Sequence, residues 1–204
     1  GYTTADLTDI DWNRFIEIGK DVKAKTGTYM LSGQADSPDT IMMMLQSAGA
    51  SLFDEDGKPA MTDNDALKEC IDIYKTMVDE GIYLEVNKWD DYVTSITKGS
   101  VAGVINGNWI IATIQGMEDT AGKWEITNMP KLIKTPNATN YSNNGGSSWY
   151  ITSNCKNKDL AIDFLKSTFA GSVELYEKIL PTTGAIATYL PAGDSAAYAE
   201  PQAY

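Results

Sequence analysis

Residues Lys98 to Trp109 read Lys-Gly-Ser-Val-Ala-Gly-Val-Ile-Asn-Gly-Asn-Trp. The apolar run Val101–Ile105 lies between glycines, which predicts a short buried strand. Asn106-Gly107 ends that strand, and Asn108 can cap a helix running from Trp109 towards Met117. Open α/β sheets bind ligands where strands end and helices begin. The spacing leaves two interpretations of Trp109 open, packing beneath the helix or facing a ligand.

Composition narrows the possible partners of the chain. Its 204 residues suffice for one large domain or two small ones, and 43% of them are hydrophobic. Acidic residues outnumber basic ones by 28 to 16, for a net charge of −12. This balance argues against nucleic-acid binding and against a polybasic membrane surface. Arg14 is the one arginine, so a neutral or cationic ligand fits the sequence better than a small anion.

Missing residue types exclude several chemistries. The sequence has no histidine, which removes Ser-His-Asp catalysis, Cys-His catalysis and histidine-containing zinc sites. Cys70 and Cys155 form no CxxC motif, so the sequence has no thiolate metal cluster and no dithiol redox motif. We expect no metal site and no cofactor. Cys70 falls on the apolar side of a helical pattern, which indicates a buried thiol. A disulfide between the two cysteines stays open, since an extracellular compartment would permit it.

Hydrophobic periodicity predicts helices alternating with short strands, which is typical of a helix-rich α/β or α+β domain. Asp9 or Asp11 should cap the first long helix, Gly27 should end it, and Thr62-x-x-Asp65 should start another. Asp56-Gly57 predicts a hairpin turn. We expect helices within residues 6–26, 37–49, 62–81, 89–98, 157–171 and 172–179, strands at 28–31, 123–129 and 147–152, a loop at 131–147, and a turn at 181–184.

Two tryptophans follow turns that are rich in glycine and amides. Trp109 follows Asn106-Gly107-Asn108, and Trp149 follows a run that contains Gly145-Gly146. Sugar rings have apolar faces and polar rims, so an aromatic ring beside amide and hydroxyl groups is typical of a carbohydrate site. Trp12 and Trp124 lie in periodic segments and are expected in the core. Trp89 is open to either interpretation, core or cleft.

Adjacent acidic residues raise the alternative of a glycosidase. Such an enzyme needs two carboxylates converging on one cleft. Sequence spacing cannot show convergence, and a solvated acidic face is the simpler interpretation. The candidate pairs are Asp54 with Asp56, Asp90 with Asp91, and Glu118 with Asp119.

The order of several motifs resembles one family, the extracellular solute-binding proteins of the maltose-binding type, which deliver sugars to ABC importers. The match is collinear over residues 2 to 190. It rests on Trp12–Lys20, the hairpin Ser47–Lys58, the helix ending at Asp79-Glu80-Gly81, the stretch Lys98–Trp109, Met129-Pro130, Gly145-Gly146-Ser147, Asn157–Leu165 and Pro181–Gly184.

The resemblance implies a helix-rich α/β fold of the periplasmic-binding-protein-like class II, mainly its second, C-terminal lobe. Residues 2–129 would form that second lobe. Residues 130–180 would be the crossover and the returning segment of the first lobe, and 181–204 a turn back and a weakly structured tail. We therefore expect a fragment that lacks most of the N-terminal lobe and whose own affinity for ligand is weak or absent.

The resemblance also implies a non-catalytic protein that binds a mono- or oligosaccharide and passes it to a membrane permease. We expect it outside the cytoplasm, in the periplasm or lipid-anchored on the outer face of the membrane, as a monomer. A secreted carbohydrate-active enzyme, a cell-surface interaction module, and an amino-acid or polyamine ligand stay open as alternatives. The implied ligand-binding residues are Trp109, Asn108, Asn106, Trp149, Gly145, Gly146, Asp39, Thr40 and Met43, the last three on a helix that carries no aromatic residue here.

Overall fold

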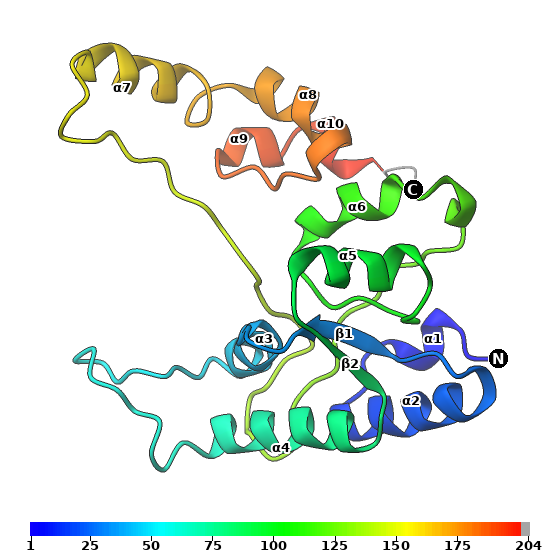
Figure 1. Ribbon diagram of the computed structural model, residues 1–204. Coiled ribbons are helices and arrows are strands. Elements are labelled where there is room, and N and C mark those ends of the chain that lie inside the picture. Colours follow the sequence, from blue (N-terminus) through cyan, green and yellow to red (C-terminus); the bar gives the residue numbers. More distant parts are fainter. Residues whose placement is uncertain (201–204) are drawn as a thin grey trace. The chain divides into compact units, whose positions relative to one another are not determined.

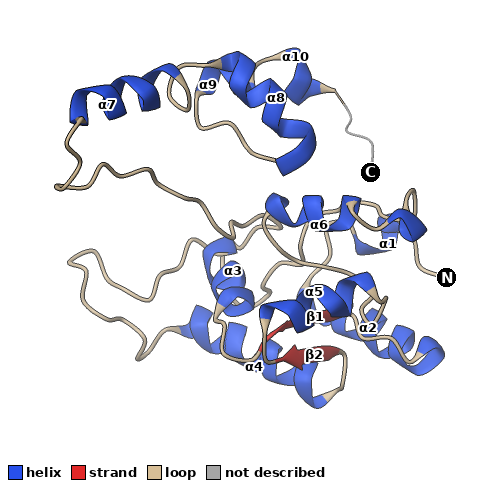
Figure 2. Cartoon of the chain, turned by 45° about the horizontal axis from the view of Figure 1, so that its top comes forward, coloured by secondary structure: helices blue, strands red, loops and turns tan. Residues whose placement is uncertain are grey.

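The computed structural model describes residues 1–200. The chain forms two compact units, which we call unit 1 and unit 2. Unit 1 consists of Gly1–Asn106 and Lys123–Asn144, and unit 2 consists of Gly107–Gly122 and the chain from Gly145 onward. Helices and loops make up most of the described chain (Figure 2). No helix among these residues is long and apolar enough to cross a membrane.

Unit 1 is built on a parallel pair of strands, β1 (Leu31–Gln34) and β2 (Tyr83–Val86). Leu31 pairs with Tyr83 and Gln34 with Val86. Helix α5 (Trp89–Thr97) lies on one side of the strands, and α2 (Trp12–Thr26) and α4 (Asp65–Asp79) lie on the other (Figure 1). Helices therefore cover both faces of the strands, as parallel pairing requires.

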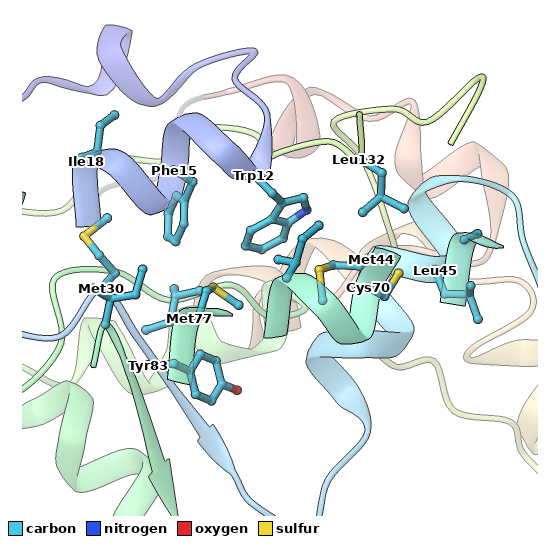
Figure 3. Close-up of a cluster of buried hydrophobic side chains, with 14 residues drawn as sticks. Trp12, Phe15, Ile18, Met30, Met44, Leu45, Cys70, Met77, Tyr83 and Leu132 are labelled. Atoms are coloured by element: carbon cyan, nitrogen blue, oxygen red, sulfur yellow. The ribbon is translucent and has the colours of Figure 1, made fainter. Parts of the chain in front are cut away.

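The core of unit 1 lies between α2, α4 and the strands. Trp12 and Phe15 of α2 meet edge to face, with ring centroids 5.4 Å apart. Helix α3 (Asp39–Ser47) adds Met44 and Leu45, which are fully buried. Figure 3 shows these side chains converging with Met30, Cys70, Met77, Tyr83 and Leu132 from other parts of unit 1.

Most helix boundaries in unit 1 agree with the sequence. The Asp11 carboxylate accepts a hydrogen bond from the Arg14 N–H, and Gly27 ends α2 with a φ of 76°, which favours glycine. The expected capping box at Thr62 is wrong, because Asn64 caps α4 by accepting from the Leu67 N–H. The short α1 (Thr4–Leu7) precedes α2.

The strand predictions need more correction. Val101–Ile105 is no continuous strand: Val101 alone forms a bridge, parallel to Tyr29. Strand β1 begins later than the predicted 28–31, and β2 was not predicted. The predicted strands at 123–129 and 147–152 are wrong, since neither segment forms a strand. The turn at Asp56-Gly57 is confirmed, with Phe53 and Pro59 bridged across it.

Residues 123–144 return to unit 1 as an extended segment, which is held largely by side chains. Lys131 pairs with Asp11 beside α2. The buried Glu69 carboxylate of α4 accepts from the N–H groups of Ile133 and Lys134 and from the Thr135 hydroxyl, at 2.8 to 2.9 Å. Burial alone would raise the pKa of Glu69, but these hydrogen bonds outweigh it and lower that pKa.

Unit 2 is built of short helices. Asn108 was expected to cap a helix, but its side chain donates to the Gly184 carbonyl, so this prediction is wrong. The predicted turn at 181–184 forms the last turn of α8, with Gly184 in the left-handed region. The elements are η1 (Asn108–Ile110), α6 (Ile111–Gln115), η2 (Glu118–Thr120), α7 (Lys158–Ser167), α8 (Val173–Thr183), α9 (Leu190–Gly193) and α10 (Ala196–Ala199).

Both cysteines are free thiols. Cys70 is fully buried in the core of unit 1, as predicted, and Cys155 belongs to unit 2. Burial and the neighbouring charge of Glu69 raise the pKa of the Cys70 thiol to about 12. The possible disulfide that the sequence left open is therefore not formed in this structure.

Candidate functional site

Unit 1 has a pocket at the carboxyl end of β1, beside the first turns of α3 and α5. Ligands bind at this position in open α/β sheets, where strands end and helix N-termini begin. The lining combines aromatic rings, hydroxyls and amides. It consists of Ser32, Gly33, Gln34, Ser37, Asp39, Thr40, Met43, Tyr83, Trp89, Tyr92, Ile105, Asn106 and Asn144.

Tyr83 forms part of the pocket lining and is almost fully buried. Its hydroxyl lies 2.8 Å from the Thr40 hydroxyl, which links β2 to α3. It also lies against Gly33, where an added Cβ would come within 1.9 Å of the Tyr83 oxygen. Burial raises the pKa of Tyr83 to about 12, so this hydroxyl stays protonated. A glycine at position 33 is needed to leave room for the tyrosine.

A chain of polar side chains continues from α5 into the returning segment. The Asn106 amide nitrogen donates to the Tyr92 hydroxyl at 2.9 Å, and Asn144 donates to the Asn106 amide oxygen at 2.6 Å. Asn106 and Asn144 are the residues at which the chain leaves unit 1. The pocket is therefore closed by side chains from parts of the sequence that lie far apart.

Trp89 supplies the indole of the pocket. It is 43% exposed, and its ring centroid lies 5.3 Å from that of the more buried Tyr92. The two interpretations that the sequence left open for Trp89 are thus resolved in favour of a cleft. An exposed indole beside hydroxyls and amides can stack on an apolar ring face while polar groups bind its rim.

The pocket carries negative rather than positive charge. Among the described lining residues, Asp39 is the only carboxylate, and no lysine or arginine contributes. Burial is the main cause of the raised pKa of Tyr83 and Tyr92, and the charge of Asp39 raises the pKa of both tyrosines further. Such a site suits a neutral, hydroxyl-rich ligand and repels anions.

Four of the nine residues proposed from the sequence line this pocket: Asp39, Thr40, Met43 and Asn106. The other five, Trp109, Asn108, Trp149, Gly145 and Gly146, belong to unit 2. Within unit 2, Trp109 is 39% exposed, and its indole nitrogen lies against Gly145, where an added Cβ would approach it to 3.2 Å. The single site predicted from the sequence therefore combined two groups of residues that belong to different units of the structure.

Trp149 has a different neighbour. Its ring stacks on Phe169 with centroids 4.6 Å apart, yet 64% of Trp149 is exposed. Gly146 is exposed and has a φ of 108°, a conformation that favours glycine. Asn108 lines a second, mainly apolar pocket of unit 2 with Ile111, Gln115, Leu180, Gly184, Ala185, Ile186 and Tyr198.

Sequence reasoning missed Ser32, Gln34, Tyr83, Tyr92 and Asn144 as lining residues. The signal for Tyr83 was present, since Ile82-Tyr83-Leu84-Glu85-Val86 follows a helix-ending glycine and has strand composition. Asn144 had no local signal, because it reaches the pocket through a long irregular segment. Trp12 is confirmed as a core residue at 1% exposure.

The described residues offer little for catalysis or for a metal ion. No group of three or more Cys, Asp or Glu side chains within residues 1–200 is placed to hold a metal. Of the acidic pairs considered for glycosidase chemistry, none lines the pocket in unit 1, where Asp39 is the one carboxylate. Two converging carboxylates are therefore not found in that pocket.

Comparison with curated proteins reveals two relatives. The lactose-binding protein of Rhizobium radiobacter is 41% identical over 201 residues, which are 98% of this chain and 47% of that protein. The arabinooligosaccharide-binding protein of Halalkalibacterium halodurans is 24% identical over 170 residues, 78% of this chain and 37% of that protein. The chain thus spans about half the length of the first relative and a smaller share of the second.

Solved structures share the fold. A solute-binding protein of an ABC transporter from Thermotoga lettingae, solved with α-D-tagatose, superimposes with a TM-score of 0.74 at 20% identity, covering 94% of this chain and 50% of that one. The sugar-binding protein MalE of Xanthomonas citri gives a TM-score of 0.72 at 14% identity, covering 94% and 49%. The fold is thus helix-rich α/β of the periplasmic-binding-protein type, as the sequence predicted.

A family model provides the remaining comparison. It matches residues 3–204 and describes bacterial extracellular solute-binding proteins. Proteins of this family bind solutes rather than catalyse reactions, and they act outside the cytoplasm. With nearly its whole length matched, this chain belongs to the bacterial extracellular solute-binding protein family.

Proposed function

We propose that this chain is the sugar-recognising part of a solute-binding protein that serves an ABC importer. The pocket of unit 1 carries the proposal: an exposed indole, Trp89, stands beside hydroxyl and amide groups, and no basic side chain lines the pocket. An aromatic face with neutral polar groups around it is the arrangement that recognises a sugar ring.

The relatives narrow the proposed ligand class. The relative at 41% identity is a lactose-binding protein, and the second binds arabino-oligosaccharides. We accordingly favour a mono- or oligosaccharide. The permease partner follows from the family, and the place of action would be the periplasm or the outer face of the cytoplasmic membrane, on a lipid anchor.

We also propose the lobe assignment that the sequence suggested. Most of residues 2–129, the expected second lobe, lies in unit 1. The expected returning segment 130–180 lies in unit 1 up to Asn144 and in unit 2 thereafter. Among the described residues, unit 2 buries few apolar side chains, which supports the view that its segments complete a lobe formed mainly by the other half of the relatives' length.

The test is a titration of the chain with lactose, arabino-oligosaccharides and monosaccharides, followed by two-dimensional NMR, which detects millimolar affinities. Resonances of the pocket residues should shift, and those of Trp89 most. Amino acids and spermidine serve as ligands of other classes. If no sugar shifts the pocket resonances, or if spermidine alone does, the proposed function is wrong.

Variants locate the contact. Trp89→Ala should weaken sugar binding about tenfold, since losing a stacked indole costs roughly 1–1.5 kcal/mol. Phe53→Ala, an exposed aromatic of the hairpin that does not line the pocket, is the matched control and should leave the affinity unchanged.

Trp109→Ala measures the share of unit 2 in the same titration. The sequence-based assignment requires a loss of about fivefold, on the order of 1 kcal/mol. An affinity within about threefold of the unaltered chain would remove Trp109 from the site.

A further inference from the structure

Helix α5 presents to the pocket a hydroxyl whose own contacts leave its proton available. Tyr92 is 5% exposed and lines the pocket. Its oxygen accepts a hydrogen bond from the Asn106 amide nitrogen at 2.9 Å. Within residues 1–200 the Tyr92 hydroxyl has no acceptor for its own proton. A buried donor without an acceptor is costly, and a ligand that supplies the acceptor recovers that cost.

The direction of the polar chain makes Tyr92 a donor. Asn144 donates to the Asn106 amide oxygen at 2.6 Å, which fixes the orientation of the Asn106 amide and aims its nitrogen at Tyr92. Because the phenol oxygen accepts from Asn106, its proton points elsewhere. Burial raises the pKa of Tyr92, and the charge of Asp39 raises it further, so the hydroxyl keeps this proton.

The opposite polarity is found at Ser32 on β1. The Ser95 hydroxyl donates its only proton to the Tyr92 carbonyl at 2.7 Å. In the 2.6 Å contact between Ser32 and Ser95, Ser32 must therefore be the donor. Ser32 then offers the pocket lone pairs only.

A donor at Tyr92 and an acceptor at Ser32 together select among ligand classes. An alcohol both donates and accepts, so it satisfies both groups, whereas an ammonium group cannot accept and a carboxylate cannot donate. This polarity favours a sugar over the polyamine ligands that the sequence left open, since a protonated polyamine offers no acceptor.

We infer that Tyr92 is a specificity-determining residue of the pocket, which donates a hydrogen bond to a hydroxyl oxygen of the bound sugar. The inference rests on the proposed sugar-binding function of the same pocket. It assigns to α5 a polar contact in addition to the stacking surface of Trp89.

Tyr92→Phe tests the inference, because it removes the hydroxyl and keeps the ring. Its affinity for a sugar that binds the unaltered chain should fall about 3- to 10-fold, the range of one neutral hydrogen bond. Tyr74→Phe is the matched control: the Tyr74 hydroxyl donates to Glu85 at 2.7 Å, outside the pocket lining. The control should bind as the unaltered chain does.

A series of monodeoxy sugars, measured on the unaltered chain, identifies the hydroxyl concerned. One deoxy sugar should bind 3- to 10-fold more weakly, and for that sugar Tyr92→Phe should cause no further loss. Equal affinity of Tyr92→Phe and the unaltered chain, equal losses in Tyr92→Phe and Tyr74→Phe, or uniform binding of all deoxy sugars would each overturn the inference while sugar binding itself stands. Absence of sugar binding by the unaltered chain would refute both proposals.

Discussion

The two units differ in how they use their apolar residues. Unit 1 buries large side chains completely, among them Met44, Leu45 and Met77. Unit 2 leaves Leu160 of α7 69% exposed and Phe164 57% exposed, and among the described residues α7 has no buried side chain. An amphipathic helix gains stability mainly by burying its apolar face. Unit 1 therefore has a hydrophobic core of its own. Helix α7 has the amphipathic sequence of a helix that packs on a core, but its apolar side chains are exposed.

The largest expected effect contrasts two leucine truncations. Leu45→Ala in the core of unit 1 should lower the free energy of unfolding by about 2–5 kcal/mol, from lost burial and the cavity left behind. Leu160→Ala in unit 2 should change it by no more than about 0.5 kcal/mol. Urea denaturation followed by tryptophan fluorescence measures both. If the two variants lost similar amounts of unfolding free energy, the proposed difference between the cores of the two units would be wrong.

The next effect concerns the returning segment of unit 1. Glu69→Gln should destabilise the protein by about 2 kcal/mol at neutral pH, since hydrogen bonds to a buried charged acceptor are lost. The folded pKa of Glu69 is lowered, so its stabilisation is present above the unfolded value of about 4.3 and disappears as the pH falls through the folded value. The gap between the unaltered protein and the variant should therefore narrow in acid.

Urea denaturation at several pH values measures this gap. Glu174→Gln is the control in unit 2, because that carboxylate forms an exposed pair with Lys178. It should not alter the unfolding midpoint at neutral pH. A gap for Glu69→Gln that stays constant down to strongly acid pH would show that the charge of Glu69 does not hold the segment.

The smallest effect compares two glycines. Gly33→Ala in unit 1 should cost about 1–2 kcal/mol, because its Cβ would collide with the Tyr83 hydroxyl and displace it. Gly193→Ala in unit 2 meets no atom within 4 Å and should be nearly neutral. Adding Tyr83→Phe to Gly33→Ala should recover part of the loss, and thermal unfolding of the three variants reports it. No recovery would mean that the clash lies elsewhere.

Local signals predicted the helices well and the strands poorly. Asp11, Gly27 and the apolar period of α4 act within a few residues, so they can be recognised in the sequence. A strand needs a partner: Val101 has one residue to pair with, Tyr29, while the neighbouring apolar residues have none in a ladder. The composition of Val101–Ile105 did not indicate that only its first residue would find a pairing partner.

The same limit applies to the candidate site. Asp39, Thr40 and Met43 came from the resemblance to the family and do line the pocket. Trp109 was favoured over Trp89 because of the resemblance to the family, yet the exposure of an indole beside Tyr92 and Thr40 depends on how β1, β2 and α5 pack. The side chain of Asn108 donates a hydrogen bond to the carbonyl of Gly184, which lies far along the chain. Contacts of this kind are decided by tertiary structure.

The backbone N–H of Trp12 donates to the carbonyl of Lys131, at the start of the longest helix near the N-terminus. During synthesis on the ribosome, the first turn of α2 therefore emerges long before its partner does. Since chains are made from the N-terminus, unit 1 cannot complete its hydrogen bonding until the segment after Gly122 has been translated. A gene shortened after Asn144 therefore encodes unit 1 together with residues 107–122, and unit 1 alone requires a linker in place of those residues.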